Sequence, residues 1–252
     1  MATVVTVMDR EGFDQRTDNV VVVQPGRHRL LWIPRDTWCD VIGDRINVAY
    51  KRGGHEALRE GLASLGIPVE HSLCLSRAAV ERVLAHAVVT VPVEQPIRLW
   101  YPLTPTTRVE DARKPVDFFP PREELQGERI HQWLGARHGR EPGAGISDLH
   151  RIQRQQVFVR ALIRQGFDFS AVLAGSPEPA LSDPEALDDL RRVRSWWRFA
   201  CTDQLVDRTV DGRQVLVLQS PEPRPPRWRR GATRVTTRAT TLVTRSARTD
   251  SH

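Results

Sequence analysis

Charged residues stand at the ends of three apolar runs near the N-terminus, and this pattern constrains the fold more than any other. The run 29–33 stops at Pro34 and is followed by Arg35 and Asp36. Short, β-branched apolar runs bounded by turn residues predict buried strands. The two earlier runs, 3–8 and 19–24, also have charged neighbours: Asp9, Arg16 and Asp18. If the three strands are adjacent, one edge of the sheet holds carboxylates and guanidinium groups, which suits a metal ion and a phosphate.

The other apolar patterns alternate between strand and helix, which predicts an α/β domain. The strongest helix is 147–164, with Ser147 placed to cap its N-terminus. Asp148, Arg151 and Gln155 share one face of that helix, because residues three, four and seven apart lie side by side. The same spacing is also common on a solvated face with a local ion pair. The other elements expected are strands 71–75, 88–93 and 215–218, a short helix 46–50, and helices 55–65, 76–85, 127–134 and 183–199.

Two segments without periodicity are expected to be loops. Residues 34–45 follow the third strand, and residues 96–121 are rich in proline, which suits a lid or a specificity insert. Three tryptophans, Trp133, Trp196 and Trp197, are expected to lie in the core rather than beside a cofactor.

Composition divides the chain into a body and a basic tail. The chain has 252 residues, of which 40% are hydrophobic, so residues 1–219 are expected to form a single domain with one core. The net charge of +6 is carried by residues 220–252, which hold eight arginines and two acidic residues. That segment is rich in Pro, Arg and Thr and is predicted to be disordered. It could touch an anionic membrane surface, whereas its single aromatic residue, Trp228, disfavours nucleic acid.

The sequence has no apolar stretch of the roughly 18 residues that a membrane span needs, and no signal peptide precedes the first strand. As printed, it predicts a cytoplasmic protein. It would be extracytoplasmic and membrane-attached if an N-terminal anchor lay outside this sequence. Cys39, Cys74 and Cys201 have neither a disulfide framework nor zinc spacing.

The acidic and basic candidates have two interpretations each. Asp9 and Asp18 suit magnesium, which takes one or two carboxylates together with phosphate oxygens, although aspartate is also common in turns. A cluster of arginines would repel itself unless an anion lay within it, so true convergence would imply a ligand. The candidate cluster is Arg16, Arg35, Arg45, Arg137 and Arg151.

The ordered set of these pieces resembles the LytR-CpsA-Psr family of cell-envelope phosphotransferases over about residues 3–165. The matching pieces are Asp9, Arg16-Thr17-Asp18, Ile33–Thr37, Arg45–Tyr50 with Gly53-Gly54, Gly66–His71, Leu125–Glu128, Ala136–His138 and Asp148–Gln156. The resemblance implies an α/β fold with a central mixed sheet, flanking helices and an apolar groove for a prenyl chain. It also implies transfer of a glycosyl phosphate from a polyprenyl pyrophosphate carrier to a peptidoglycan hydroxyl, which attaches cell-envelope glycopolymers in an actinobacterial type of envelope.

By the same resemblance, Asp9 and Asp18 would hold Mg²⁺. The pyrophosphate would be gripped by Arg16, Arg35, Arg45, Arg137, Arg151 and Gln155. Asp36, Asp148 and Gln155 would orient the arginines or the acceptor, and Arg35, Asp36 and Asp148 are the expected catalytic residues. Phosphoryl-type transfer relies on positioning and charge neutralisation, which such a set can supply.

Three departures from the family pattern keep alternatives open. Gly135 stands where the family usually has an arginine, Ala87-Val88 replaces a Gly-Gly pair, and the membrane anchor is absent from the sequence as printed. One alternative is a soluble relative in specialised metabolism that hydrolyses, transfers or cyclises a prenyl diphosphate. The other is a binding protein that retains the groove without catalysis.

Overall fold

The computed structural model describes residues 2–8, 16–104, 109–140, 148–168, 184–202 and 205–218. All of these lie in one compact unit, Met1–Gln219. The basic tail lies outside the described residues, so the division into a domain and a disordered tail stays a prediction. No helix within the described ranges is both long enough and apolar enough to cross a membrane.

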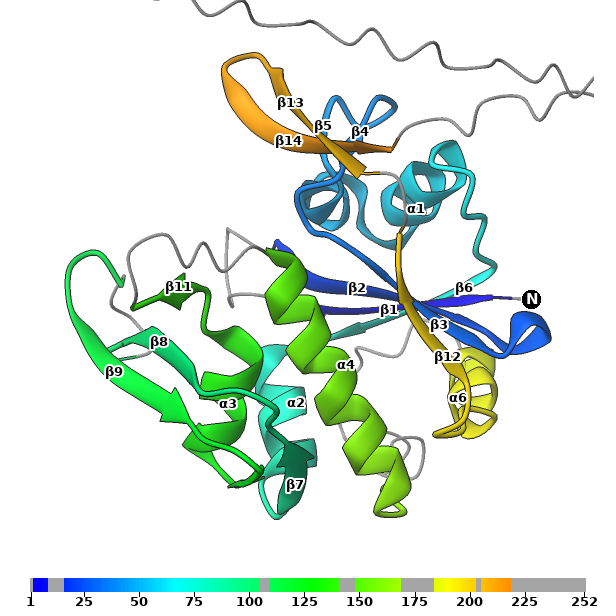
Figure 1. Ribbon diagram of the computed structural model, residues 1–252. Coiled ribbons are helices and arrows are strands. Elements are labelled where there is room, and N and C mark those ends of the chain that lie inside the picture. The colour runs from blue at the N-terminus through cyan, green and yellow to red at the C-terminus, as the bar shows by residue number, and fades with distance from the viewer. Residues whose placement is uncertain are drawn as a thin grey trace, which may run out of the picture. The chain divides into compact units, whose positions relative to one another are not determined.

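The centre of the fold is a five-stranded mixed sheet with the order β12-β3-β2-β1-β6. Strands β1 and β2 are antiparallel, as are β2 and β3, whereas β6 and β12 add at the two edges in parallel. The three strands expected near the N-terminus are therefore neighbours, as predicted (Figure 1). The strands are β1 (Thr3–Met8), β2 (Thr17–Gln24), β3 (Arg29–Ile33), β6 (His71–Leu75) and β12 (Arg198–Cys201).

The two faces of this sheet are covered differently. Val4, Val20 and Val22 are completely or almost completely buried, and they pack in one cluster with Leu58 and Leu62 of α1 (Ala49–Ser64). The opposite face packs against α4 (Asp148–Arg164) and α6 (Pro184–Arg191), through clusters that contain Trp32, Ile152, Leu73 and Leu187. This arrangement is the central mixed sheet with flanking helices that the sequence predicts.

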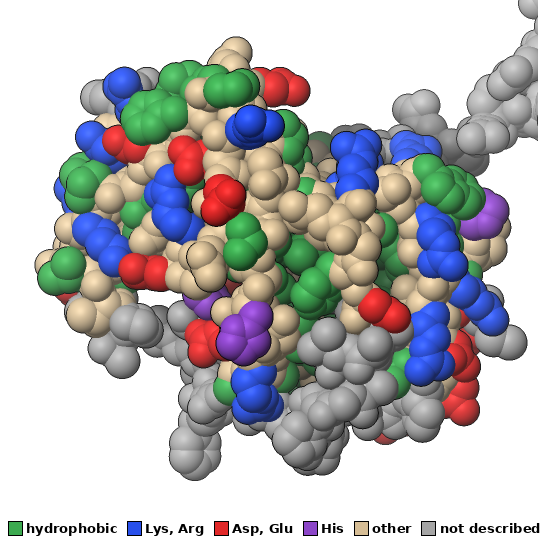
Figure 2. Space-filling view, turned by 90° about the horizontal axis from the view of Figure 1, so that it is seen from below, with side chains coloured by type: hydrophobic (Ala, Val, Ile, Leu, Met, Phe, Trp, Pro, Cys, Tyr) green, Lys and Arg blue, Asp and Glu red, His purple; other side chains and the backbone are tan. Residues whose placement is uncertain are grey.

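The face towards α4 and α6 is apolar but only partly covered by the described residues. Val5 and Val21 are paired in the middle of the sheet, yet both are half-buried. Val83 and Val159, from helices over the same face, are also only partly buried. Figure 2 shows apolar side chains in a hollow near the middle of the molecule's lower side. This half-open apolar face is the expected position of the prenyl groove.

A second layer of short strands and helices packs beside the central sheet (Figure 1). Its core contains Val91, Leu99, Phe118 and Trp133. Two small sheets form it, β10-β7 and β11-β8-β9. The elements are α2 (Arg77–Leu84), β7 (Val89–Pro92), β8 (Ile97–Pro102), β9 (Arg113–Phe118), β10 (Arg122–Leu125), α3 (Glu128–Gly135) and β11 (His138–Gly139).

The loop expected at 96–121 is wrong in two stretches, because β8 and β9 form an antiparallel pair there. The prolines mislead, since Pro115 lies on the edge strand β9, where a missing N–H costs no ladder hydrogen bond. Leu99, Val116 and Phe118 are the buried positions that hold the pair in place. Residues 105–108 lie outside the described ranges.

Three other expectations need correction. The helix expected at 183–199 ends at Arg191, and Phe199 belongs to β12, whose aromatic and apolar residues pair with β3. The loop 34–45 contains a short pair, β4 (Trp38–Cys39) and β5 (Asp44–Arg45). Trp196 is 65% exposed rather than in the core, whereas Trp133 and Trp197 are buried as expected.

The short helix expected at 46–50 is a 3-10 turn, η2 (Ile46–Val48), that leads directly into α1. Gly53 and Gly54 have non-helical backbone angles and kink α1, which explains why the pattern suggested a start only at His55. Strand 71–75 and helix 76–85 are confirmed, and the Ser76 side chain caps α2 by accepting from the Ala79 N–H. The proposed cap Ser147 lies outside the described residues.

The described part of the chain ends in a hairpin that packs on the loop after β3. Its strands are β13 (Leu205–Val210) and β14 (Arg213–Leu218), of which the sequence predicted only the second. Asp211 and Gly212 at the turn both have positive φ, as two-residue hairpin turns require. Leu216 of β14 forms a parallel bridge with Thr37, so this hairpin borders the charged edge of the sheet.

Candidate functional site

The candidate site lies at one edge of the central sheet, where β1 and β3 end and β2 begins. Thr17 pairs with Met8, the last residue of β1, and Asp18 follows directly. Arg35 comes two residues after β3, whose last residue, Ile33, pairs with Val20. The pairing therefore brings Asp18 and Arg35 from separate segments to the same edge.

Three arginines from three different segments converge on the Asp18 carboxylate. Arg35 forms an ion pair with Oδ1 of Asp18 from the loop after β3. Arg137 Nη2, from the segment after α3, lies 2.7 Å from the same oxygen. Arg151 Nη1, from the first turns of α4, lies 3.1 Å from it, and this arginine side chain is only 1% exposed. The other oxygen, Oδ2, takes part in none of these three ion pairs.

The arginines determine the charge state of Asp18. Burial alone would raise the pKa of this carboxyl, but the positive charges of Arg151, Arg137 and Arg35 outweigh that effect and hold the pKa well below its usual range. Asp18 is therefore a carboxylate at any physiological pH. The three guanidinium groups carry more positive charge than the single carboxylate of Asp18 can balance.

The cluster continues from Arg35 through Asp36 to Arg45. Arg35 Nε lies 3.9 Å from Oδ1 of Asp36, and Arg45 Nη1 lies 3.2 Å from the same oxygen. Asp36 thus stands between two arginines, which agrees with its expected part in orienting them. Oδ1 itself is buried, but the Asp36 side chain as a whole is 34% exposed, so part of it can reach a ligand.

The C-terminal hairpin supports this part of the site, which sequence reasoning missed. The backbone N–H of Leu216 donates to the Asp36 carbonyl at 3.1 Å. Arg45 Nη2 donates to the Gln214 carbonyl at 2.7 Å. These contacts use backbone atoms of β14, so no side-chain motif could have revealed them.

Two residues of α4 position the other side of the site. Arg154, which is 5% exposed, donates to the carbonyls of Trp133 and Ala136 at the end of α3. Burial, with a smaller contribution from Arg151, lowers the pKa of Arg154 to about 10. Gln155 Nε2 donates to the Leu134 carbonyl at 3.2 Å. Together they hold the end of α3, from which Arg137 follows.

Arg154 was not among the predicted site residues, although it lies between Arg151 and Gln155. Only its burial distinguishes it from a solvated helix arginine, and burial could not be read from the spacing. Gln155 was predicted, and its Oε1 atom is buried without a hydrogen-bond partner among the described residues. A buried acceptor of this kind is costly unless something binds it.

Asn47 is a further polar residue beneath the site. Its backbone N–H donates to the Arg35 carbonyl at 3.2 Å, and its side chain is completely buried. Neither side-chain amide atom has a hydrogen-bond partner within the described ranges. Asn47 lies in one of the matching pieces, Arg45–Tyr50, but no role was predicted for it.

The structure thus brings together most of the predicted site residues. Arg16 directly precedes β2 at the same edge and is half-buried. Asp148 begins α4, one turn before Arg151, but its side chain lies outside what the structure describes. Asp9 follows Met8 and also lies outside the described residues. The residues in direct contact are Asp18, Arg35, Asp36, Arg45, Arg137 and Arg151.

The donor set near Asp18 fits a magnesium ion better than a metal held by protein alone. No group of three or more His, Cys, Asp or Glu side chains among the described residues could hold a metal ion. Magnesium, however, is commonly held by one or two carboxylates, several waters and substrate phosphates. The Asp18 carboxylate supplies oxygens of the right chemistry, and its ion pairs with the three arginines are made through Oδ1.

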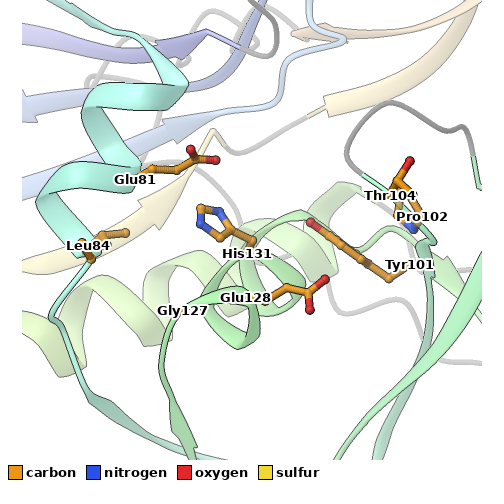
Figure 3. Close-up of a pocket in the computed structure, with 9 residues that line it drawn as sticks. Glu81, Leu84, Tyr101, Pro102, Thr104, Gly127, Glu128 and His131 are labelled. Atoms are coloured by element: carbon orange, nitrogen blue, oxygen red, sulfur yellow. The ribbon is translucent and has the colours of Figure 1, made fainter.

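A pocket of about 370 Å³ opens between α2, α3 and the end of β8. Figure 3 shows Glu81, Tyr101 and His131 with their polar ends directed towards this space. Gly135 ends α3 beside it, and a Cβ at that position would lie 3.8 Å from Cε2 of Tyr101. The glycine that departs from the family pattern therefore faces the ring of Tyr101, which lines the pocket.

Comparison with solved structures supports the fold. TagT bound to LIIa-WTA has 20% sequence identity and a TM-score of 0.58, with 87% of this chain and 84% of that chain covered. TagT with bound octaprenyl pyrophosphate lipid has 19% identity and a TM-score of 0.55, with 87% and 83% covered. TagV from B. subtilis has 18% identity and a TM-score of 0.56, with 87% and 91% covered. At these identities the likeness shows the fold alone.

The comparison of sequences identifies the family. No curated protein matches the chain. The sequence profile of the LytR_cpsA_psr family matches residues 5–180, which include the strands, loops and helices that carry the arginine cluster. The chain therefore belongs to the LytR-CpsA-Psr family, whose members are transferases that act on polyprenyl-linked substrates.

Proposed function

We propose that this protein is a magnesium-dependent transferase that acts on a glycan linked to a prenyl or polyprenyl pyrophosphate. It would transfer the glycosyl phosphate to an acceptor hydroxyl, as in attachment of cell-envelope glycopolymers to peptidoglycan. The observation that carries this proposal is the convergence of Arg35, Arg137 and Arg151 on Asp18.

The charges of the cluster favour a multiply charged anion. Among the described residues, Arg35, Arg137 and Arg151 form ion pairs with the Asp18 carboxylate, and Arg35 and Arg45 lie near that of Asp36. Guanidinium groups bind phosphate oxygens in a fixed geometry and often through two hydrogen bonds. A pyrophosphate would relieve the repulsion among the arginines and would be held by the same groups. Arg16 and Gln155 are proposed to join the binding set.

The half-open apolar face supports a lipid carrier. It begins next to the charged edge, since Val21 lies three residues after Asp18 on β2. A prenyl chain could lie along this face while its pyrophosphate occupies the arginine cluster. The similar chain with bound octaprenyl pyrophosphate lipid supports a ligand of this class.

Asp9 and Asp18 are proposed to hold Mg²⁺ through their carboxylate oxygens. When bound, the ion would neutralise charge on the pyrophosphate. The side chains of the protein would position the substrate. The arginines would bind phosphate oxygens, and Asp36 would hold Arg35 and Arg45 in place. In the transfer, the acceptor oxygen bonds to the glycosyl phosphorus and the bond from that phosphorus to the bridging oxygen breaks. Polyprenyl phosphate leaves, and the acceptor proton passes to a carboxylate, for which Asp36 and Asp148 are the candidates.

The pocket beside Gly135 is proposed to receive a sugar of the substrate or the acceptor. Its volume of about 370 Å³ suits a small ligand. Tyr101 offers an aromatic face, while Glu81 and His131 offer hydrogen-bonding groups to sugar hydroxyls. The glycine that replaces the family's arginine would then alter the choice of glycan rather than abolish transfer.

A second candidate function is favoured by the same glycine. With one arginine fewer, the site could be specialised for a short prenyl diphosphate, which it would hydrolyse, transfer or cyclise. Incubation with Mg²⁺ and prenyl diphosphates of several lengths separates the two functions. Turnover of a short diphosphate without any acceptor would favour this second function, and no turnover of any length would exclude it.

The direct test of the first function is release of polyprenyl phosphate from a lipid-linked glycan, with peptidoglycan and Mg²⁺ present. We expect release to depend on acceptor and to fall at least about a hundredfold in Arg35→Ala, since loss of a charge-stabilising group typically costs 10²–10³ in rate. The exposed Arg122→Ala variant serves as a charge-matched control. Equal activity of Arg35→Ala and the wild type would contradict the proposal.

A further inference from the structure

A basic and aromatic surface lies at the end of the central sheet opposite the arginine cluster. Residues 191–198 read Arg-Arg-Val-Arg-Ser-Trp-Trp-Arg, with four arginines, two tryptophans and no acidic residue. The turn between β2 and β3 adds further exposed basic and aromatic residues next to it. We call this the Trp196 surface, and its exposed members are Arg27, His28, Arg192, Arg194, Trp196 and Arg198.

Trp196 is fixed in an exposed position. It is 65% exposed, whereas its neighbour Trp197 is 3% exposed and packs in the core with Leu30 and Trp32. The ring of His28 contacts Trp196 edge-on, with 4.9 Å between ring centroids. Trp196 therefore offers an apolar ring in a defined position to a partner.

The arginines of this surface are largely available to a ligand. Within the described residues, Arg27, Arg194 and Arg198 form no ion pair, and Arg194 Nη1 donates only to the carbonyls of Arg191 and Val193. Arg192 lies 3.5 Å from Asp189, a carboxylate that also accepts a hydrogen bond from Thr3. A hollow of about 290 Å³ lies among Arg192, Arg194, His28 and the two tryptophans. Its chemistry suits a phosphate group beside an apolar moiety.

The position of the Trp196 surface links it to the half-open apolar face. β2 runs from Thr17 beside the arginine cluster to Gln24 beside the Trp196 surface, a distance of about 23 Å for eight residues of strand. The half-open apolar face, with Val5 and Val21, lies between the two ends. Figure 2 shows basic side chains gathered on the right of the lower side, the end at which the β2–β3 turn lies in Figure 1.

We propose that the Trp196 surface docks on an anionic lipid bilayer. Tryptophan favours the interface between head groups and acyl chains, and arginines near the surface attract anionic head groups. A prenyl chain on the apolar face could then enter from the bilayer at this end while its pyrophosphate reaches the arginines at the other. A nucleic acid is the less suitable partner, because stacking platforms present several aromatic rings and Trp196 is the one exposed ring of the pair.

The test is binding of the full-length protein to vesicles of phosphatidylcholine alone or with an equal part of phosphatidylglycerol, without any substrate. The tail is present in every variant, so it contributes equally. We expect Arg194→Gln/Arg198→Gln to weaken binding to the anionic vesicles by about fivefold per arginine. Trp196→Ala should weaken binding as well. Vesicle binding should shift the tryptophan fluorescence of the wild type to shorter wavelength, and this shift should be smaller in Trp196→Ala.

Matched controls are Arg122→Gln/Arg208→Gln, which remove two exposed arginines elsewhere, and Phe119→Ala, which removes another exposed aromatic side chain. Thermal unfolding of each variant confirms that it is folded. The proposal is wrong if the Trp196-surface variants bind anionic vesicles as tightly as their controls. It is equally wrong if they lose affinity for a single-stranded oligonucleotide while vesicle binding is unchanged. Because no prenyl pyrophosphate is present, failure of the proposed transfer reaction would leave this test unaffected.

Discussion

Arg151 and Asp18 are 133 positions apart in the chain, yet Nη1 of the arginine lies 3.1 Å from Oδ1 of the aspartate. The contact joins α4 to the first residues of β2, and it places a fully buried cation at the centre of the arginine cluster. Stability and ligand binding should therefore depend on the same pair.

Replacing Asp18 should destabilise the fold. In Asp18→Asn, the buried Arg151 loses its charged partner, which typically costs 3–5 kcal/mol for a buried pair. Because the Asp18 side chain is 19% exposed, we expect a smaller loss of about 2–3 kcal/mol in urea unfolding. Asp36→Asn is the control, since its carboxylate is 34% exposed and should cost less than about 1 kcal/mol. If the two variants lose equal free energy of unfolding, Asp18 is not the partner on which the buried Arg151 depends.

The same pair predicts a pH dependence. The folded-state pKa of Asp18 lies below the unfolded value of about 3.9, so its stabilisation is complete well above that pH and is lost as pH falls towards the folded pKa. The stability difference between wild type and Asp18→Asn should be constant from about pH 7 to 5 and should shrink below about pH 4. Urea midpoints at each pH measure it. A difference that grows on acidification would refute the assigned charge state.

The hairpin contact can be removed without touching any charged side chain. Leu216→Pro lacks the N–H that donates to Asp36, while its pairing with Asp207 in β13 does not use that N–H. We expect weaker substrate binding, by about fivefold for one hydrogen bond, with the fold retained. Leu218→Pro lies on the same edge two residues farther along and serves as the control. If both prolines have the same effect, β14 does not position Asp36.

Gly135→Arg tests the departure from the family. A side chain fits there, because its Cβ would be in ordinary contact with Tyr101. One added charge-assisted hydrogen bond should tighten binding of a prenyl pyrophosphate by about tenfold, while the new side chain should hinder the sugar pocket. Gly135→Ala is the control, because it removes the glycine without adding a charge. Titration with a pyrophosphate lipid and with its glycan-linked form distinguishes the two effects, and unchanged affinity for both would argue against a site beside Gly135.

The magnesium dependence of the transfer reaction should change when Asp18 is replaced. Removal of divalent ions with a chelator should abolish transfer, and Mg²⁺ should restore it in the wild type. In Asp18→Asn, the Mg²⁺ concentration for half-maximal activity should rise by at least about tenfold, because a carboxylate ligand is lost. Activity that survives complete chelation would remove the metal from the proposal.

The sequence predicted the charged edge of the sheet because strand ends are local signals. A run of valines indicates β2 and the apolar run Leu30–Ile33 indicates β3, and the pairing of the two strands then brings Asp18 and Arg35 to one place. The convergence of Arg137 and Arg151 could be expected only through the resemblance to a family, since no local pattern measures a distance across 119 or 133 residues.

Other parts could not be predicted for definite physical reasons. The hairpin supports Arg45 and Asp36 through backbone atoms, which leave no residue signature. The prolines of residues 96–121 suggested a loop, but Pro115 lies on β9, and edge strands tolerate prolines that central strands exclude. Trp196 was expected in the core because its neighbour Trp197 is indeed buried, and only tertiary packing separates the two.

The most direct test is the affinity of the protein for farnesyl pyrophosphate, measured calorimetrically with Mg²⁺ for the wild type, Arg137→Gln and Arg140→Gln. Arg137 is 36% exposed and belongs to the cluster, whereas Arg140 is similarly exposed and pairs with Asp117 away from it. We predict that Arg137→Gln weakens binding by at least about tenfold, because one charge-assisted hydrogen bond contributes about that much to affinity. Arg140→Gln should have no effect. Farnesol should bind all three proteins alike. Equal binding of the pyrophosphate by all three would contradict a pyrophosphate site built on Asp18 and its arginines.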